Sequence, residues 1–212
     1  MAERGRPRNF NRANALTKAM ELFWERGYEN ASMSELTSCM SIGTTSLYAA
    51  FGSKEALFKE AVDLYCMTDG AAVWRETLAA PTACEAVQAL LLSSAREFSR
   101  TDKPSGCLVI LSALNGGKSD ADASVLGEVV ARRKRNVDVL AEKLASGIDS
   151  SEVHADVDWQ AVARYFITVQ QGMSVQARDG ADRNTLETIA HSALAAWPAL
   201  TGENPGAAQA TP

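Results

Sequence analysis

Residues 31–54 read ASMSELTSCMSIGTTSLYAAFGSK, a pattern of two short helices separated by a tight turn. The first helix is predicted to begin at Ser32, because Ser32 and Glu35 have the spacing of a capping box, in which each side chain bonds the other residue's backbone N–H. Residues 41–43 are expected to end it, with Gly43 supplying the unusual backbone angle. The second helix is then predicted from about Thr44 to Ala50.

The second short helix has small polar residues at its start, while Leu47 and Phe51 lie four apart on its inner face. This pattern is a helix-turn-helix, whose second helix enters a DNA major groove and meets base edges with its N-terminal side chains. An ordinary helical hairpin within an all-α domain has the same spacing, so the spacing alone leaves both interpretations open.

The wider sequence resembles the DNA-binding domain of TetR-type (TetR/AcrR-like) transcriptional regulators, which are helix-turn-helix proteins. The matching segments, which together run from residue 5 to residue 57, are Gly5-Arg-Pro-Arg8, Ala19–Phe23, Gly27-Tyr28, Ser46-Leu-Tyr48, Phe51 and Ser53–Leu57. Two positions depart from the family pattern. Ser41 stands where the turn usually has Gly, and Ala50 stands where the residue is often aromatic or His. We expect Ser41 to influence operator preference more than fold.

The resemblance implies a double-stranded DNA operator as partner. The residues that we expect to contact DNA lie in a basic arm and on the two short helices: Arg6, Arg8, Ser32, Ser34, Thr44, Thr45, Ser46, Tyr48 and Lys54. The arm is also compatible with a disordered, solubilising tail, Tyr48 with a core position, and Lys54 with a solvated surface position. We favour phosphate contact for Tyr48, because the family places its tyrosine near the DNA backbone, and for Lys54, because phosphates bind at helix N-termini.

Charge is unevenly distributed along the 212 residues, whose net charge is −5. Residues 1–59 hold eight Lys and Arg against six Asp and Glu, whereas the remainder holds 13 against 20. Nucleic-acid contact is therefore expected in the N-terminal quarter, and one weakly basic copy is expected to bind DNA weakly. A basic cluster at 132–135 is interpreted as a solvated helix face, since acidic residues flank it at helical spacings.

No alternating pattern predicts a strand, so the fold class is all-α with about nine helices. We predict a DNA-binding domain at 9–60 (helix-turn-helix at about 32–51), a larger helical effector-binding and dimerisation domain at 61–200, and a disordered tail at 201–212. One helix is expected to run from Ser53 towards Leu78, and the last long helices are expected at about 158–178 and 182–197, with Pro198 ending the second. No apolar run is long enough to cross a membrane and no signal peptide is recognisable, so a cytoplasmic protein is expected.

The resemblance further implies a homodimer formed through the last two helices, a mostly apolar pocket for an unidentified small-molecule effector, and a role in repression. The residues that we expect to line this pocket are apolar or aromatic: Tyr65, Met67, Trp74, Phe98, Cys107, Leu111, Phe166, Val169 and Met173. Each of these residues also suits an ordinary core position. No cofactor or metal is expected, because the four cysteines and two histidines are far apart in sequence.

Cys107 follows a glycine at a predicted helix start, where backbone N–H dipoles lower a thiol pKa. A thiol sensor of oxidants or electrophiles on the same DNA-binding scaffold is therefore one alternative, and a buried apolar role for Cys107 is the simpler interpretation. A helical ligand-binding protein or an enzyme without DNA binding is a further alternative. An enzyme is disfavoured, because neither His154 nor His191 has a nucleophile or metal ligand at a suitable spacing.

Overall fold

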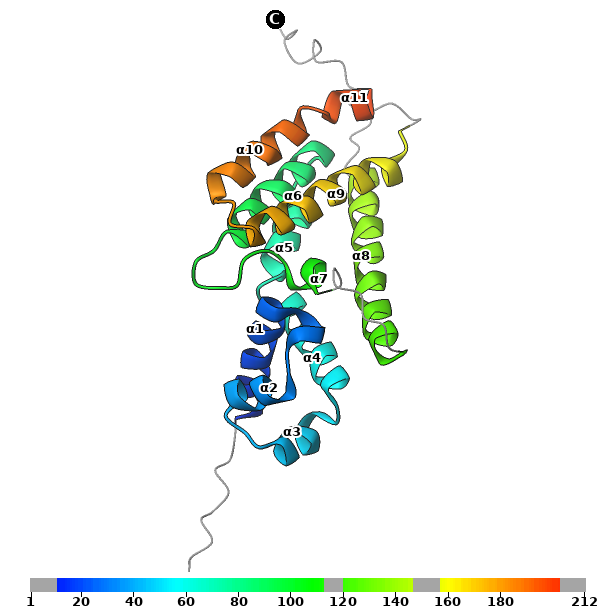
Figure 1. Cartoon of the computed structure of the whole chain (residues 1–212). Helices are drawn as coiled ribbons and strands as arrows, with labels where there is room; N and C mark the ends of the chain where they lie inside the picture. The colour runs from blue at the N-terminus through cyan, green and yellow to red at the C-terminus, as the bar shows by residue number, and fades with distance from the viewer. Residues whose placement is uncertain (1–10, 113–119, 147–156, 203–212) are drawn as a thin grey trace, which may run out of the picture.

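A computed structural model describes residues 11–112, 120–146 and 157–202 (Figure 1). These residues form eleven helices: α1 Arg12–Asn30, α2 Met33–Met40, α3 Thr44–Phe51, α4 Lys54–Met67, α5 Ala71–Ala79, α6 Ala83–Phe98, α7 Leu108–Leu111, α8 Asp120–Ser146, α9 Trp159–Arg178, α10 Arg183–Leu194 and α11 Trp197–Thr201. The all-α prediction is confirmed. The sequence predicted about nine helices, and the additional ones are α5 and α11.

Helices α1–α4 form one end of the molecule, which we call the head (Figure 1). Its core contains the predicted residues Phe23, Leu36 and Leu47, each with no exposed surface, and Tyr28, which stacks on Phe23. The head core continues upward through Tyr65 of α4 and includes Leu108 of α7. The predicted domain boundary at residue 60 stays a prediction, since α4 itself continues to Met67.

The turn between α2 and α3 differs from the prediction. Gly43 has an ordinary extended conformation (φ −78°, ψ 159°) as the N-cap of α3. Ser41 instead occupies the left-handed region (φ 58°, ψ 40°) and ends α2, as the one non-glycine residue with positive φ in the described part of the chain. The turn requires a left-handed backbone at this position, which is why the family usually has glycine there. Ser41 adopts the same backbone conformation in place of that glycine.

The helix predicted from residue 53 towards residue 78 is broken into α4 and α5. Thr68 leaves the helical region (φ −118°, ψ −96°), and its hydroxyl donates to the Leu64 carbonyl at 2.7 Å. The Gly70 N–H donates to the Tyr65 carbonyl at 2.8 Å. A Cβ atom on Gly70 would lie 2.7 Å from a ring carbon of Tyr65, so the break is packed directly against this aromatic side chain.

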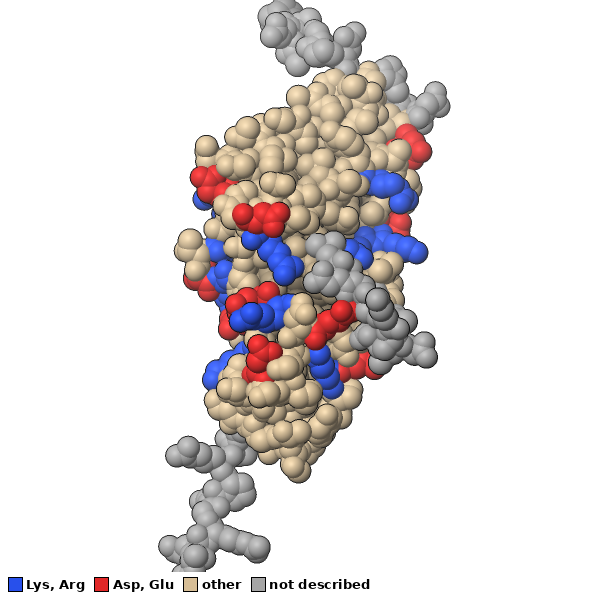
Figure 2. Space-filling view, in the orientation of Figure 1, with Lys and Arg blue, Asp and Glu red and all other residues tan. Residues whose placement is uncertain are grey.

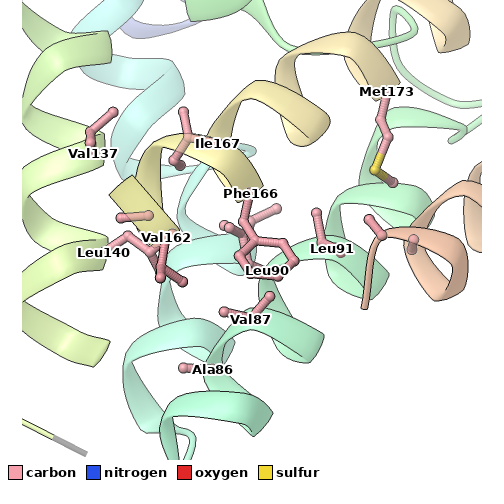
Figure 3. Packing of buried hydrophobic residues seen from close by; sticks show 14 of the residues in the cluster. Ala86, Val87, Leu90, Leu91, Val137, Leu140, Val162, Phe166, Ile167 and Met173 are labelled. Carbon is pink, nitrogen blue, oxygen red and sulfur yellow. The ribbon is translucent and has the colours of Figure 1, made fainter. Parts of the chain in front are cut away.

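The larger domain is built around α6, which lies between α9, α10 and α5 (Figure 1). Figure 3 shows side chains from α6, α8 and α9 meeting in this core, among them Leu90, Leu140 and Phe166. The broad apolar face of α9 is therefore used inside one copy of the chain. Its outward face carries Ala161, Tyr165, Thr168 and Gly172, all of them exposed.

The C-terminal end of the described chain also departs from the prediction. Pro198 does not end the preceding helix but stands in the first turn of α11, where its missing N–H leaves no helical bond unmade. Trp197 is buried against the core next to Phe166. None of the helices in the described ranges is long and apolar enough to cross a membrane.

Candidate DNA-binding surface and effector cavity

Helix α3 presents the predicted DNA-contacting side chains to solvent. Leu47 and Phe51 are buried beneath it, which leaves Thr44, Thr45 and Ser46 exposed. Its N-cap, Gly43, provides no side-chain hydrogen bond, so the first backbone N–H groups of α3 have no cap. This end of α3 offers hydroxyl and N–H donors with no charged side chain among its first residues.

Tyr48 and the two serines of α2 are also accessible. Tyr48 is 48% exposed, which excludes the core position and leaves its hydroxyl free to reach a phosphate. Ser32 and Ser34 are exposed as well. The Ser32 hydroxyl is already engaged, because the predicted capping box with Glu35 is present and its Oγ accepts from the Glu35 N–H at 3.2 Å.

Lys54 lies at the start of α4, one residue after its N-cap Ser53. Its ammonium group lies 4.6 Å from the centre of the Tyr28 ring and donates to the Glu29 carbonyl at 3.4 Å. Lys54 is therefore held over the end of α1, and its phosphate contact stays a prediction. Arg6 and Arg8, the other predicted cations, lie outside the described residues.

Arg12 has a structural role that the sequence did not reveal. Its guanidinium bonds both carboxylate oxygens of Glu60 at 2.7 and 2.8 Å, donates to the Ala50 carbonyl at 3.3 Å and lies 4.4 Å over the Phe51 ring. The start of α1 is thus fixed to the end of α3. In the sequence Arg12 is indistinguishable from the arginines of the arm, and only its tertiary contacts give it a different role.

The folded head is not itself basic. Residues 11–60 contain five Lys and Arg and six Asp and Glu, whereas residues 1–10 contain three Arg and one Glu. On the face shown in Figure 2, the tip of the head is free of charged side chains. The positive charge that would attract phosphate therefore comes mainly from the N-terminal arm.

A cavity of about 300 Å³ lies between the head and the core of the larger domain. Its lining comes from α4–α9 and the short segments that join α4 to α5 and α6 to α7: Tyr65, Cys66, Asp69, Gly70, Val73, Trp74, Leu78, Glu97, Phe98, Cys107, Val109, Ile110, Arg132, Arg135, Asn136, Val139 and Gln170. The volume is at the small end of the range for ligand sites.

Four predicted pocket residues line this cavity, namely Tyr65, Trp74, Phe98 and Cys107. The others do not, which corrects the prediction. Phe166 and Met173 point into the core of the larger domain (Figure 3), and Val169 packs against the same core. Leu111 is buried beside Gly106, and Met67 is 71% exposed to solvent. Apolar character alone could not separate cavity wall from core or surface.

The cavity wall also contains polar residues, which an apolar and aromatic pattern in the sequence could not predict: Asp69, Glu97, Arg132, Arg135, Asn136 and Gln170. Two wall carboxylates already have cationic partners. Asp69 pairs with Arg100 at 3.4 Å and with Lys103 at 3.7 Å, and Glu97 pairs with Arg100 at 3.3 Å. Both carboxylates are mostly buried, so their charges are compensated within the protein.

Arg132 corrects the interpretation of the cluster at 132–135 as a solvated face. Its side chain is only 20% exposed and bonds Asp63 of α4 and, at 3.1 Å, Glu128 of its own helix. Lys59 of α4 also reaches Glu128, at 3.7 Å. A ladder of alternating charges therefore joins α8 to the last helix of the head.

Cys107 is partly buried at the N-cap of α7, where its N–H donates to the Ser174 hydroxyl at 2.9 Å. Burial raises the pKa of the Cys107 thiol, although a hydrogen bond with the Tyr65 hydroxyl opposes this effect. The expected lowering of its pKa by helix dipoles is therefore wrong, because α7 has a single turn and desolvation is the larger effect. Burial likewise raises the pKa of Cys66, and Arg132 opposes that shift.

Comparisons with known proteins agree with this geometry. Residues 15–61 match the family described as "Bacterial regulatory proteins, tetR family". The chain is 32% identical over 200 residues to the HTH-type transcriptional repressor ComR of Escherichia coli K12, covering 93% of each protein. It is 27% identical over 196 residues to the repressor BdcR of the same organism, covering 92% of each. A solved cysteine mutant of the regulator CifR, bound to 26-base-pair operator DNA, has a TM-score of 0.85 and 41% identity, over 91% of this chain and 100% of that one.

Proposed function

Because this chain belongs to the TetR family of bacterial transcriptional regulators, we propose that it represses transcription by occupying operator DNA as a homodimer and leaves the DNA when a small effector binds. The exposed row Thr44, Thr45, Ser46 and Tyr48, standing over buried Leu47 and Phe51, is the observation on which the proposal depends. The similar regulator CifR was solved in complex with operator DNA, which supports the same assignment.

The charge and the shape of one copy support dimerisation through α9 and α10. The head carries little positive charge, so two linked heads on a palindromic site gain the avidity that a single head lacks. Ala161, Tyr165, Thr168 and Gly172 recur on the outer face of α9 at helical spacing, and small residues among them allow a second helix to approach closely. This face is our proposed interface.

The cavity between the head and the larger domain is the proposed effector site. It touches both α4, which belongs to the head, and α9, which belongs to the proposed interface. A ligand in this position contacts the elements that set the separation of the two heads. Repression would then follow from occlusion of a promoter, and induction from the change in separation.

Fluorescence anisotropy of the full chain on DNA that flanks its own gene tests the proposal. Binding should weaken steeply as salt rises, because arm and head contacts release counterions. Tyr48→Phe removes one hydroxyl and Lys54→Ala one cation, and both should weaken binding. Gln88→Ala, at an exposed position of α6 outside the head, the cavity lining and the proposed interface, is the control. Binding equal to that of random DNA at every salt concentration would refute the operator assignment.

A thiol sensor remains a second candidate, because Cys107 and Cys66 both line the cavity. An α,β-unsaturated carbonyl compound would alkylate the thiol by addition: the carbon–sulfur bond forms as the carbon–carbon π bond opens, and the thiol proton is transferred to the α-carbon. The CifR complexes were solved with cysteine mutants, a property of that protein that makes the cysteines here worth testing. A Cys107→Ser protein that still releases DNA on treatment with an alkylating electrophile would exclude this function for Cys107.

A further inference from the structure

The wall of the cavity has two chemically different sides. Helix α8 contributes Arg132, Arg135, Asn136 and Val139, which follow one another at the spacing of a single helix face. The part of the wall that comes from α5 and α6 is mainly apolar and aromatic, with Val73, Trp74, Leu78 and Phe98, and the carboxylates Asp69 and Glu97 beside it are each paired with a cation. A ligand that fills the cavity therefore meets polar donors from α8 and apolar side chains from α5 and α6.

Among the described residues, some hydrogen-bond donors on this wall have no acceptor. The Arg132 Nε–H is buried and has no hydrogen-bond partner. Arg132 bonds Asp63 and Glu128 through one terminal nitrogen, which leaves its Nε–H over. The side chains of Arg135 and Asn136 make no hydrogen bond or ion pair with the described residues, whereas the wall carboxylates Asp69 and Glu97 are both paired with cations. A buried donor without a partner is uncommon in native proteins and requires an explanation.

From this asymmetry we propose that the effector is a small organic anion, such as a monocarboxylate with an apolar body. Its anionic group would bind Arg132 and Arg135, and its body would pack on Trp74 and Phe98. A cationic ligand would instead have to displace the existing partners of Asp69 and Glu97. The cavity volume of about 300 Å³ corresponds to roughly ten water-sized groups, which suits a short acid. The inference rests on the proposed role of this cavity as the effector site.

The same arginine connects the ligand to the head. Arg132 bonds Asp63 of α4 through one nitrogen while its Nε faces no partner. An anion at Arg132 would compete with Asp63 for the guanidinium and would weaken the bond between α8 and α4. Binding of the acid is therefore expected to lower affinity for DNA, whereas an uncharged analogue should do so less.

Isothermal titration calorimetry of the full chain without DNA tests the ligand class directly. The probes are benzoate, phenylacetate, hexanoate and octanoate, each compared with its primary amide. Charge-assisted bonds to arginine should make at least one acid bind about tenfold tighter than its amide. Arg132→Gln and Arg135→Gln should each reduce this preference, and Arg133→Gln, on the same helix but outside the cavity, should leave it unchanged.

If Arg132→Gln fails to fold, Arg135→Gln still tests the proposal, because Arg135 is exposed and its replacement should not prevent folding. The proposal is overturned if no acid is preferred over its amide, or if the preference survives in every folded Arg132 and Arg135 variant. Operator binding is measured separately by anisotropy. Loss of the acid preference with intact DNA binding would reject only this inference, and failure to bind DNA would reject the proposed function without affecting the calorimetric result.

Discussion

Gly106 is the residue at which a single methyl group should do the most damage to the larger domain. Its φ of +79° lies in the left-handed region, and a Cβ atom would stand 2.7 Å from Leu111 Cδ1, 2.7 Å from the Ser174 carbonyl oxygen and 2.9 Å from the Ser174 hydroxyl. The backbone conformation costs an L-residue about 1–2 kcal/mol, and the overlap adds about 1–3 kcal/mol. Gly106→Ala should therefore lower the free energy of unfolding by about 2–5 kcal/mol.

Two other glycines separate the backbone cost from the steric cost. Gly52 has the same φ of +79° and Gly180 a φ of +100°, and a Cβ atom on either would meet nothing within 4 Å. Gly52→Ala and Gly180→Ala should lose only the backbone contribution, about 1–2 kcal/mol. Urea unfolding followed by circular dichroism, at one fixed protein concentration, measures all three. If Gly106→Ala loses no more than the two controls, the close approach of Ser174 is not what requires glycine.

Three further predictions follow from the described contacts. Ser41→Gly should raise the free energy of unfolding by up to about 1 kcal/mol, because glycine adopts a left-handed φ without strain, although it also raises the entropy of the unfolded chain. Urea unfolding measures the change, and a lower free energy of unfolding would contradict the prediction. Gly172→Arg, on the proposed interface, should yield a monomer with weakened operator binding, whereas the control Gly127→Arg on α8 should stay dimeric. Analytical ultracentrifugation and anisotropy measure the two properties. A dimeric Gly172→Arg protein would rule out the proposed face. Burial raises the pKa of Cys107, so its thiolate is scarce at neutral pH. The rate of its alkylation by iodoacetamide, followed by peptide mapping, should therefore still increase with pH at about pH 9. A rate that becomes constant near neutral pH would contradict this.

The parts of the fold that follow local rules were predictable from the sequence. The capping boxes at Ser32 and Thr82 are both present, because they depend only on residues three apart. The inward positions Leu47 and Phe51 are both buried, because helical periodicity determines them. Exposure of Tyr48 follows from the same periodicity.

Features that depend on distant contacts were not predictable. The break after Met67 depends on Gly70 packing against the Tyr65 ring, and an apolar pattern that continues to Leu78 gives no sign of it. Phe166 and Phe98 are both apolar helix residues, yet the first lies in the core and the second also lines the cavity, since the neighbouring helices decide which face is filled. Arg132 looked like a surface cation because its partner Asp63 is far away in sequence.

The contacts of Arg12 also determine how the basic arm can act. The arm is joined to the chain at a residue that is bonded to Glu60 and to the end of α3, so its attachment point moves with the recognition helix. If the arginines of residues 1–10 contact DNA as proposed, the chain itself holds them beside the end of α3, so their contact is an intramolecular event once α3 has bound. Loosening Arg12 would then weaken DNA binding without removing any of the residues proposed to touch DNA.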